Sequence, residues 1–249
     1  MNLFVMDCWQ EGEGKDVCCS AIYGICALLG LESKQAFKHS WKLLKKWGSL
    51  ELPLQAPPAQ REEALGLAGQ AWSEGLIGIA VMILIAFDLF LRTGEFLSVE
   101  VAALTGSVAH GLVIDLGETK GVKRRGGRDI VTCTDPELCA LAFRVKGLRA
   151  GCLRVAELEA KAFSKWMRKT MQNFDLSHRQ LTPYSFRRGG LSSACLAGVP
   201  VSTLALRARW WDIRTAKEYI HEGAASLGAL QVTPEPRMRL RQAAANLGR

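Results

Sequence analysis

The chain has 249 residues, of which 49% are hydrophobic and 22% are charged. This composition excludes a wholly disordered chain, and the length is enough to bury a substantial core. Lysine and arginine number 32 against 24 aspartate and glutamate residues, which gives a formal net charge of +8. A basic excess of this size favours an anionic partner, of which nucleic acid is the commonest, although solubility alone could also explain it.

The start of the chain and its cysteines indicate the cellular compartment. The first residues, MNLFVMDCWQEGEGK, lack the basic n-region of a signal peptide. The eight cysteines show no paired zinc-ligand spacing and mostly sit beside apolar residues, so we expect reduced thiols. We therefore expect an intracellular protein, which would be nuclear in a eukaryote and cytoplasmic or nucleoid-associated in a bacterium or phage.

The N-terminal part of the chain predicts a small helical domain. Residues 16–31 are apolar, and residues 32–47 place Phe37, Trp41, Leu44 and Trp47 at helical steps with lysines opposite. We expect residues 1–50 to be helical and residues 51–60, which hold three prolines, to be a linker.

Residues 61–249 predict a second, mainly helical domain with one small hairpin. The run at 76–91, LIGIAVMILIAFDLFL, is short for a membrane span and carries Asp88, so it predicts a helix buried in a protein core. Residues 108–116 and 128–133 read as two strands, joined by a glycine-rich basic tip, GETKGVKRRGGR. Further helices are expected at 61–74, 135–147, 155–174, 183–198, 201–209, 212–221 and in the tail after Pro236.

Four residues carry chemistry that could act on a phosphate. Tyr219 lies in a polar run, TAKEYIH, and a phenol can serve as a covalent nucleophile. Arg92 and Arg187 have guanidinium groups that match phosphate oxygens, and Lys120 lies in the basic hairpin. Each residue also has an ordinary interpretation: a helix cap or ion pair for Arg92, a turn lysine, a solvated first turn for Arg187, and a surface tyrosine.

The order of these motifs resembles the catalytic domain of the tyrosine recombinases, the phage integrase family. The resemblance covers about residues 61–221 and rests on RTGE at Arg92, the hairpin lysine, YSFRR at Arg187, the run SSACLAGVPVSTLA, and Trp210 nine positions before Tyr219. Each motif is weak by itself, but their order and spacing together are specific. One departure is that Tyr184 stands where the family's second box usually has histidine.

The resemblance implies a mainly α catalytic domain with a small antiparallel β-hairpin sheet, preceded here by a short helical domain that corresponds to a partial core-binding domain. It implies a reaction without metal or other cofactor in which Tyr219 attacks phosphorus and Lys120 protonates the leaving oxygen. The catalytic and supporting residues that it implies are Arg92, Glu95, Lys120, Tyr184, Arg187, Trp210 and Tyr219. For contacts to the DNA backbone we expect Lys123, Arg124, Arg125, Arg128 and Arg188.

The function predicted on this basis is site-specific recombination or integration of a mobile element, through a 3′-phosphotyrosine intermediate on double-stranded DNA. The family implies a homo-tetramer on DNA and no membrane partner. Two alternatives stay open. One is a catalytically decayed DNA-binding protein, which Tyr184 and the short N-terminal domain favour, and the other is a monomeric type IB topoisomerase, which the run containing Ala197, Gly198 and Val199 disfavours.

Overall fold

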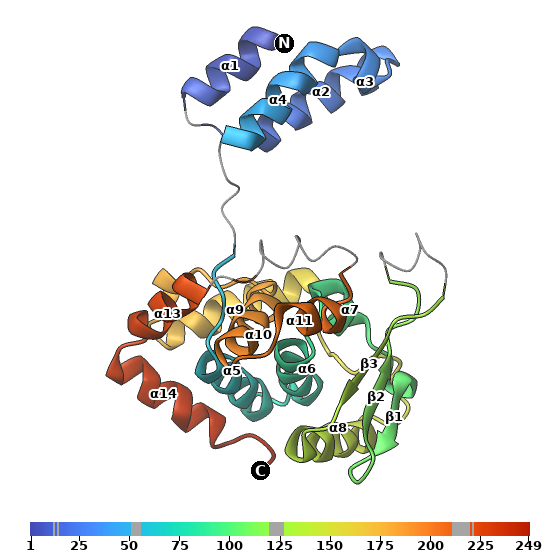
Figure 1. Cartoon of the computed structure of the whole chain (residues 1–249), viewed down its shortest axis with the longest axis vertical. Helices are drawn as coiled ribbons and strands as arrows, with labels where there is room; N and C mark the ends of the chain where they lie inside the picture. The colour runs from blue at the N-terminus through green and yellow to red at the C-terminus, as the bar shows by residue number, and fades with distance from the viewer. Residues whose placement is uncertain (12, 14, 51–55, 120–126, 211–219, 221) are drawn as a thin grey trace. The chain divides into compact units, whose positions relative to one another are not determined.

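The computed structural model describes the chain except for residues 12, 14, 51–55, 120–126, 211–219 and 221 (Figure 1). The chain divides into two compact units, Met1–Gln55 and Ala56–Arg249. In the described ranges, no helix combines the length and the apolar character that crossing a membrane requires.

The N-terminal unit is helical. Its elements are α1 (Asn2–Gln10), α2 (Lys15–Leu29), α3 (Ser33–Ala36) and α4 (Lys38–Leu50). The single helix predicted for residues 32–47 is interrupted at Phe37, whose φ of −121° and ψ of 39° are not helical. Buried side chains of α1, α2 and α4, among them Val5, Ile22 and Leu44, form the core of this unit.

The predicted reduced state of the cysteines agrees with the structure, in which none of the eight forms a disulfide. Burial, with Cys8 close by, raises the pKa of the Cys18 thiol to about 11. A thiol of this kind stays protonated near neutral pH and packs as a small apolar side chain.

The C-terminal unit contains the predicted combination of many helices and a small sheet. Its elements are α5 (Arg61–Ser73), α6 (Ile77–Asp88), α7 (Thr93–Ser98), η1 (Val101–Ala103), β1 (Leu104–Ser107), β2 (Gly111–Asp115), β3 (Ile130–Cys133), α8 (Pro136–Leu148), α9 (Ala160–Asn173), η3 (Ser177–Arg179), α10 (Ser185–Leu196), α11 (Val201–Arg207), α13 (Glu222–Gln231) and α14 (Pro234–Ala244).

Helix α6 lies at the centre of this unit. It packs against α5, α8 and α10, and nearly all of its side chains are buried (Figure 1). This arrangement explains why its sequence is apolar on every face rather than on one stripe. The prediction of a core helix is therefore confirmed, although it ends at Asp88, a few residues earlier than expected.

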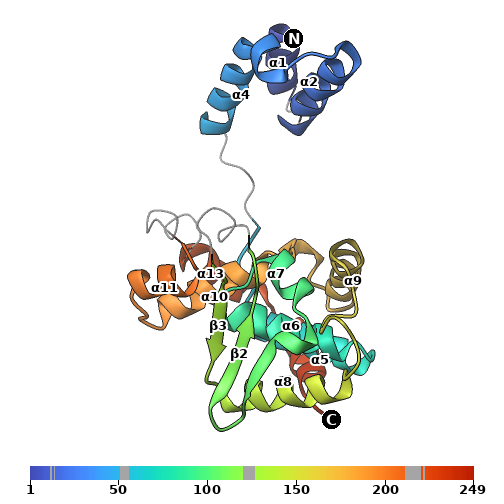
Figure 2. The same ribbon diagram turned by 90° about the vertical axis from the view of Figure 1, so that its right-hand side faces the viewer.

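The sheet has three antiparallel strands in the order β1-β2-β3, so the prediction of a two-stranded hairpin was incomplete (Figure 2). Leu104 pairs with Ile114, and Leu112 pairs with Cys133. The missed strand β1 reads LTGS, which is too short and too polar for a strand pattern. A Cβ atom at Gly106 would lie 2.2 Å from the carbonyl oxygen of Gly111, so glycine is required where β1 approaches β2.

Two further helix predictions need correction. The helix expected at 155–174 begins only at Ala160, because residues 151–158 form turns and an isolated bridge between Glu100 and Arg154. Helix α13 was not predicted, and the tail helix α14 begins at Pro234 instead of Pro236. The helix predicted at 212–221 lies almost wholly outside the described residues.

Candidate active site

Arg187 is the largest fully buried side chain in the described part of the chain. It lies in the first turn of α10, after the N-cap residue Tyr184. Its Nη1 donates to the carbonyl oxygen of Phe90 at 2.5 Å, and its Nη2 donates to that of Ala208 at 2.8 Å. These bonds join the segments after α6 and α11 to the start of α10 and fix the guanidinium plane.

The guanidinium of Arg187 sits in positive surroundings. Burial, together with the charges of Arg92 and Arg209, lowers its pKa to about 10, so the group remains protonated near neutral pH. Its Nε has no hydrogen-bond partner within the described ranges. A bound anion strongly stabilises a buried cation that lies beside two other cations.

The N-terminus of α7 places Arg92 in the site. Arg92 is the N-cap residue of this helix and not the C-cap of α6, so the C-cap interpretation was wrong. The other ordinary interpretation, an ion pair, is confirmed by the contact with Glu95. The Oε2 of Glu95 accepts a hydrogen bond from the backbone nitrogen of Arg92 at 2.8 Å, and its Oε1 accepts one from Nη1 at 2.6 Å. The side chain of Arg92 keeps 32% of its surface exposed. Glu95 therefore orients Arg92 without covering it.

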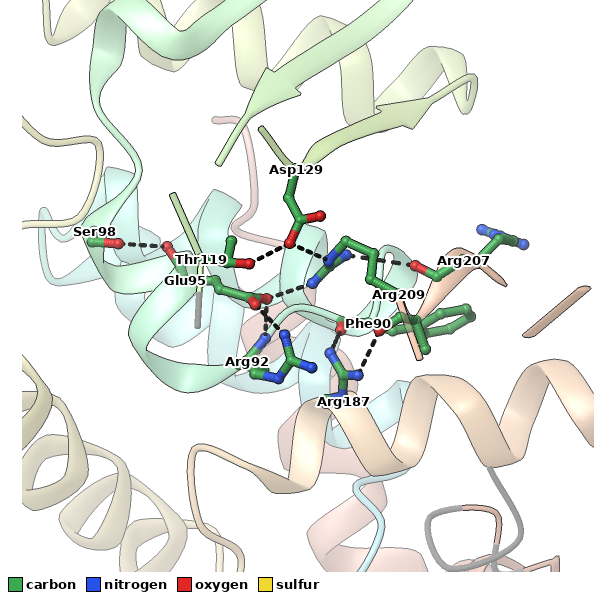
Figure 3. Close-up of polar contacts among 10 residues, drawn as sticks. Phe90, Arg92, Glu95, Ser98, Thr119, Asp129, Arg187, Arg207 and Arg209 are labelled. Atoms are coloured by element: carbon green, nitrogen blue, oxygen red, sulfur yellow. Dashed lines mark hydrogen bonds and ion pairs between the residues drawn. The ribbon is translucent and has the colours of Figure 1, made fainter. Parts of the chain in front are cut away.

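Arg209 belongs to the same cluster and was missed by the sequence analysis. Its Nη2 lies 2.5 Å from Oε2 of Glu95, and its Nε lies 3.8 Å from Oδ2 of Asp129 (Figure 3). The hydroxyl of Thr119 donates to the same carboxylate oxygen of Asp129. No motif marks Arg209, Asp129 or Thr119, because they come from separate segments that only the fold brings together.

Trp210 follows Arg209 and packs against Arg187. The Cζ atom of Arg187 lies 5.1 Å from the centre of a Trp210 ring. The ring is partly buried against a small apolar cluster that includes Phe90, Leu191 and Leu204. This packing holds a flat face of the guanidinium group and leaves its edge for hydrogen bonds.

The other predicted site residues have different positions. Tyr184 is partly exposed and interacts electrostatically with Arg187. Arg128 has 67% of its side chain exposed and forms an ion pair with Asp115 at 2.8 Å. Arg188 has only 4% of its surface exposed. Outside the described residues lie Lys120, Lys123, Arg124, Arg125 and Tyr219.

Among the described residues, the charges of the cluster do not balance. Three guanidinium groups, from Arg92, Arg187 and Arg209, face two carboxylates, from Glu95 and Asp129 (Figure 3). Fixed, partly desolvated donors of this kind can bind an oxyanion and stabilise charge that develops on it. In the described part of the chain, no group of three or more His, Cys, Asp or Glu side chains is placed to hold a metal ion.

Comparison with known proteins finds a likeness in structure but none in sequence. No family model matches the chain, and no curated protein matches it by sequence. Among solved structures it is similar to XerA recombinase, with a TM-score of 0.50 and 14% identity, over 93% of this chain and 90% of that chain. This chain accordingly has a mainly helical fold with a small antiparallel sheet, similar to that of XerA recombinase.

Proposed function

We propose that the protein cleaves and rejoins DNA strands as a tyrosine recombinase, with a covalent phosphotyrosine intermediate. The observation that carries the proposal is Arg187, a buried guanidinium held by two backbone carbonyls next to Arg92. The likeness in fold to XerA recombinase supports it. Arg92 and Arg187 also stand in the motifs that resemble those of the tyrosine recombinases. The partner would be double-stranded DNA, bound by a homo-tetramer.

In this mechanism the arginines act on the nonbridging oxygens of one phosphate. Arg92 and Arg187 neutralise their charge, which lowers the repulsion that an anionic diester presents to a nucleophile. Trp210 packs on Arg187 and would donate its indole N–H to the phosphate. The partly exposed Tyr184 would donate a hydrogen bond from its hydroxyl.

The bond changes involve Tyr219 and Lys120. The phenolic oxygen of Tyr219 loses its proton to water and forms a bond to phosphorus, while the bond from phosphorus to the 5′-oxygen breaks. Lys120 gives a proton to the departing 5′-oxygen. Attack of a free 5′-hydroxyl on the phosphotyrosine reverses these steps, so the energy of the diester bond is conserved and no nucleotide cofactor is needed.

A second function is a DNA-binding protein that has lost the cleavage step. Tyr184 favours it, because a phenol near neutral pH does not exchange protons as an imidazole does. A monomeric topoisomerase is the third function, and relaxation of supercoiled plasmid by the monomer would support it.

Incubation with nicked suicide duplexes of random sequence tests the proposal. Release of a short strand at the nick traps any covalent adduct, which migrates slowly on a denaturing gel. We expect an adduct with the natural chain and none with Tyr219→Phe. The matched control is Tyr23→Phe, since Tyr23 lies in the N-terminal unit with 58% of its surface exposed. DNA binding without any adduct would overturn the enzyme and favour the decayed DNA-binding protein.

A further inference from the structure

Arg209 occupies a backbone position that normally suits glycine. Its φ is 59°, in the left-handed region. Its N–H bonds to the carbonyl of Leu206, and the next N–H, of Trp210, bonds to that of Ala205, which is the pattern of a Schellman cap. A side chain at this position costs conformational energy, so an arginine held there points to a use for its guanidinium group.

The guanidinium group of Arg209 is directed into the protein. Only 8% of the side chain is exposed, and its neighbours are the carboxylates of Glu95 and Asp129 (Figure 3). The charge of Arg209 is already paired with these carboxylates, whereas the hydrogen bonds of Arg187 go to neutral carbonyl groups, so Arg209 is the less suited of the two to take a DNA phosphate. Any effect of Arg209 on chemistry must therefore pass through the residues that it holds.

The residue through which it acts is Glu95. One carboxylate oxygen of Glu95 accepts from Nη1 of Arg92 at 2.6 Å, and the other accepts from Nη2 of Arg209 at 2.5 Å. Arginine and a carboxylate pair best when two parallel N–H groups meet both oxygens. The oxygen that Arg209 binds also accepts from the backbone nitrogen of Arg92 at 2.8 Å, and the guanidinium group of Arg92 has a single hydrogen bond to Glu95.

We propose that Arg209 is a positioning residue, which shares Glu95 with Arg92 and so keeps the remaining N–H groups of Arg92 available for a DNA phosphate. Without Arg209, Glu95 turns both oxygens toward Arg92 and draws its guanidinium away from the phosphate. The contact with Asp129 supports this arrangement, because Asp129 is itself held by the hydroxyl of Thr119. The role of Arg209 rests on the proposed function of Arg92.

A double-mutant cycle with Arg92 tests this role. Arg209→Gly removes the guanidinium group, and the fit of glycine to the left-handed backbone offsets part of the cost of leaving Glu95 without this partner. In the full chain we expect it to slow adduct formation on nicked random-sequence duplex by about 100-fold, which is a typical cost of misplacing a catalytic group. In an Arg92→Ala background the same change should slow the reaction by less than about twofold, because the two residues act through one contact.

Two more variants separate positioning from general stabilisation. Arg209→Lys keeps a positive charge beside Glu95 and should recover part of the rate. Arg207→Ala is the matched control, since the side chain of Arg207 is exposed on α11. Its Cζ atom lies 5.0 Å from the centre of the Phe90 ring, and within the described ranges the side chain does not pair with Glu95 or Asp129. The inference is overturned if the rate losses of Arg92→Ala and Arg209→Gly multiply in the double variant, or if Arg207→Ala loses as much rate as Arg209→Gly. Neither result would affect the proposed function.

A binding measurement keeps the inference testable if no adduct forms in any variant. Inorganic phosphate can be titrated into the protein while the side-chain Nε–H resonance of Arg92 is followed by NMR. We expect weaker phosphate binding in Arg209→Gly and unchanged binding in Arg207→Ala. If phosphate affinity is the same in Arg209→Gly and the natural chain, Arg209 does not position Arg92.

Discussion

Arg187 holds the backbone of Phe90 in an unfavourable conformation. The φ of Phe90 is 56°, in the left-handed region, and its carbonyl oxygen accepts a hydrogen bond from Nη1 of Arg187 at 2.5 Å. Phe90 lies between the end of α6 and Arg92, so this bond fixes the path of the chain toward the first arginine of the cluster. The two arginines are thus coupled through the backbone as well as by charge.

We expect Arg187→Lys to lose both stability and activity. A lysine ammonium cannot span the carbonyl oxygens of Phe90 and Ala208 in the geometry of the guanidinium fork, so one buried acceptor loses its partner. The expected loss in the free energy of unfolding is about 1–3 kcal/mol. Urea denaturation measures it, with Arg207→Lys at an exposed position as the control. Equal stability of Arg187→Lys and the natural chain would mean that these bonds contribute little.

Glu95 should make the stability depend on pH in the acid range. Burial acts to raise the pKa of this carboxyl, but Arg209 and Arg92 outweigh it, so the pKa lies below its ordinary value. The ionised form therefore stabilises the fold above the unfolded-state pKa of about 4.3, and this contribution is lost as the pH falls through the folded-state pKa. We expect Glu95→Gln to be less stable by about 3–5 kcal/mol at pH 7, as when one partner of a buried ion pair is removed. The difference should shrink in urea titrations toward pH 3.

Asp88 provides a control, because its effect on stability should depend on pH in the opposite direction. Its burial raises the pKa more than the nearby Arg61 lowers it. The ionised form is then disfavoured in the fold, and this cost grows as the pH rises from the unfolded-state pKa to the folded-state pKa. Asp88→Asn should therefore be more stable than the natural chain at pH 7, and the gain should vanish at low pH. A loss of stability at pH 7 would show that the ion pair with Arg61 dominates.

Replacing Tyr184 by histidine should speed strand cleavage. Tyr184 lies at the N-cap of α10 within electrostatic range of Arg187, at the position where the resemblance implies histidine. An imidazole titrates near neutral pH and can assist proton transfer, so we expect adduct formation to rise about tenfold in Tyr184→His. Tyr184→Phe removes the hydroxyl and keeps the ring as the matched control. A slower Tyr184→His would indicate that the site is adapted to the phenol.

The docking of α14 on α5 depends on glycine. A Cβ atom at Gly69 would lie 2.0 Å from the carbonyl oxygen of Ala243, whereas one at Gly147, also within a helix, would meet nothing within 4 Å. We expect Gly69→Ala to destabilise the protein by about 1–3 kcal/mol through overpacking. Gly147→Ala should be neutral or stabilising by up to about 1 kcal/mol. Thermal and urea unfolding of both variants compare the two sites, and a neutral Gly69→Ala would show that α14 can move away.

Much of the helical architecture could be predicted from local sequence. The unbroken apolar run of α6 indicated a core helix, and Asp135 followed by Pro136 marked the start of α8, where the Asp135 side chain accepts from the nitrogen of Leu138. The strand β1 could not be predicted, because its four residues are held by pairing with β2 and not by their own pattern.

For the candidate site, the sequence by itself determined which residue types stand in which order, and so it singled out Arg92, Glu95, Arg187 and Trp210. Only the tertiary structure decided that Arg187 is buried and held by two carbonyls, and that Arg209 shares Glu95 with Arg92. Motif order and spacing identify candidate residues along the chain. Burial and charge balance arise between segments distant in the chain, so they exist only once the chain is folded.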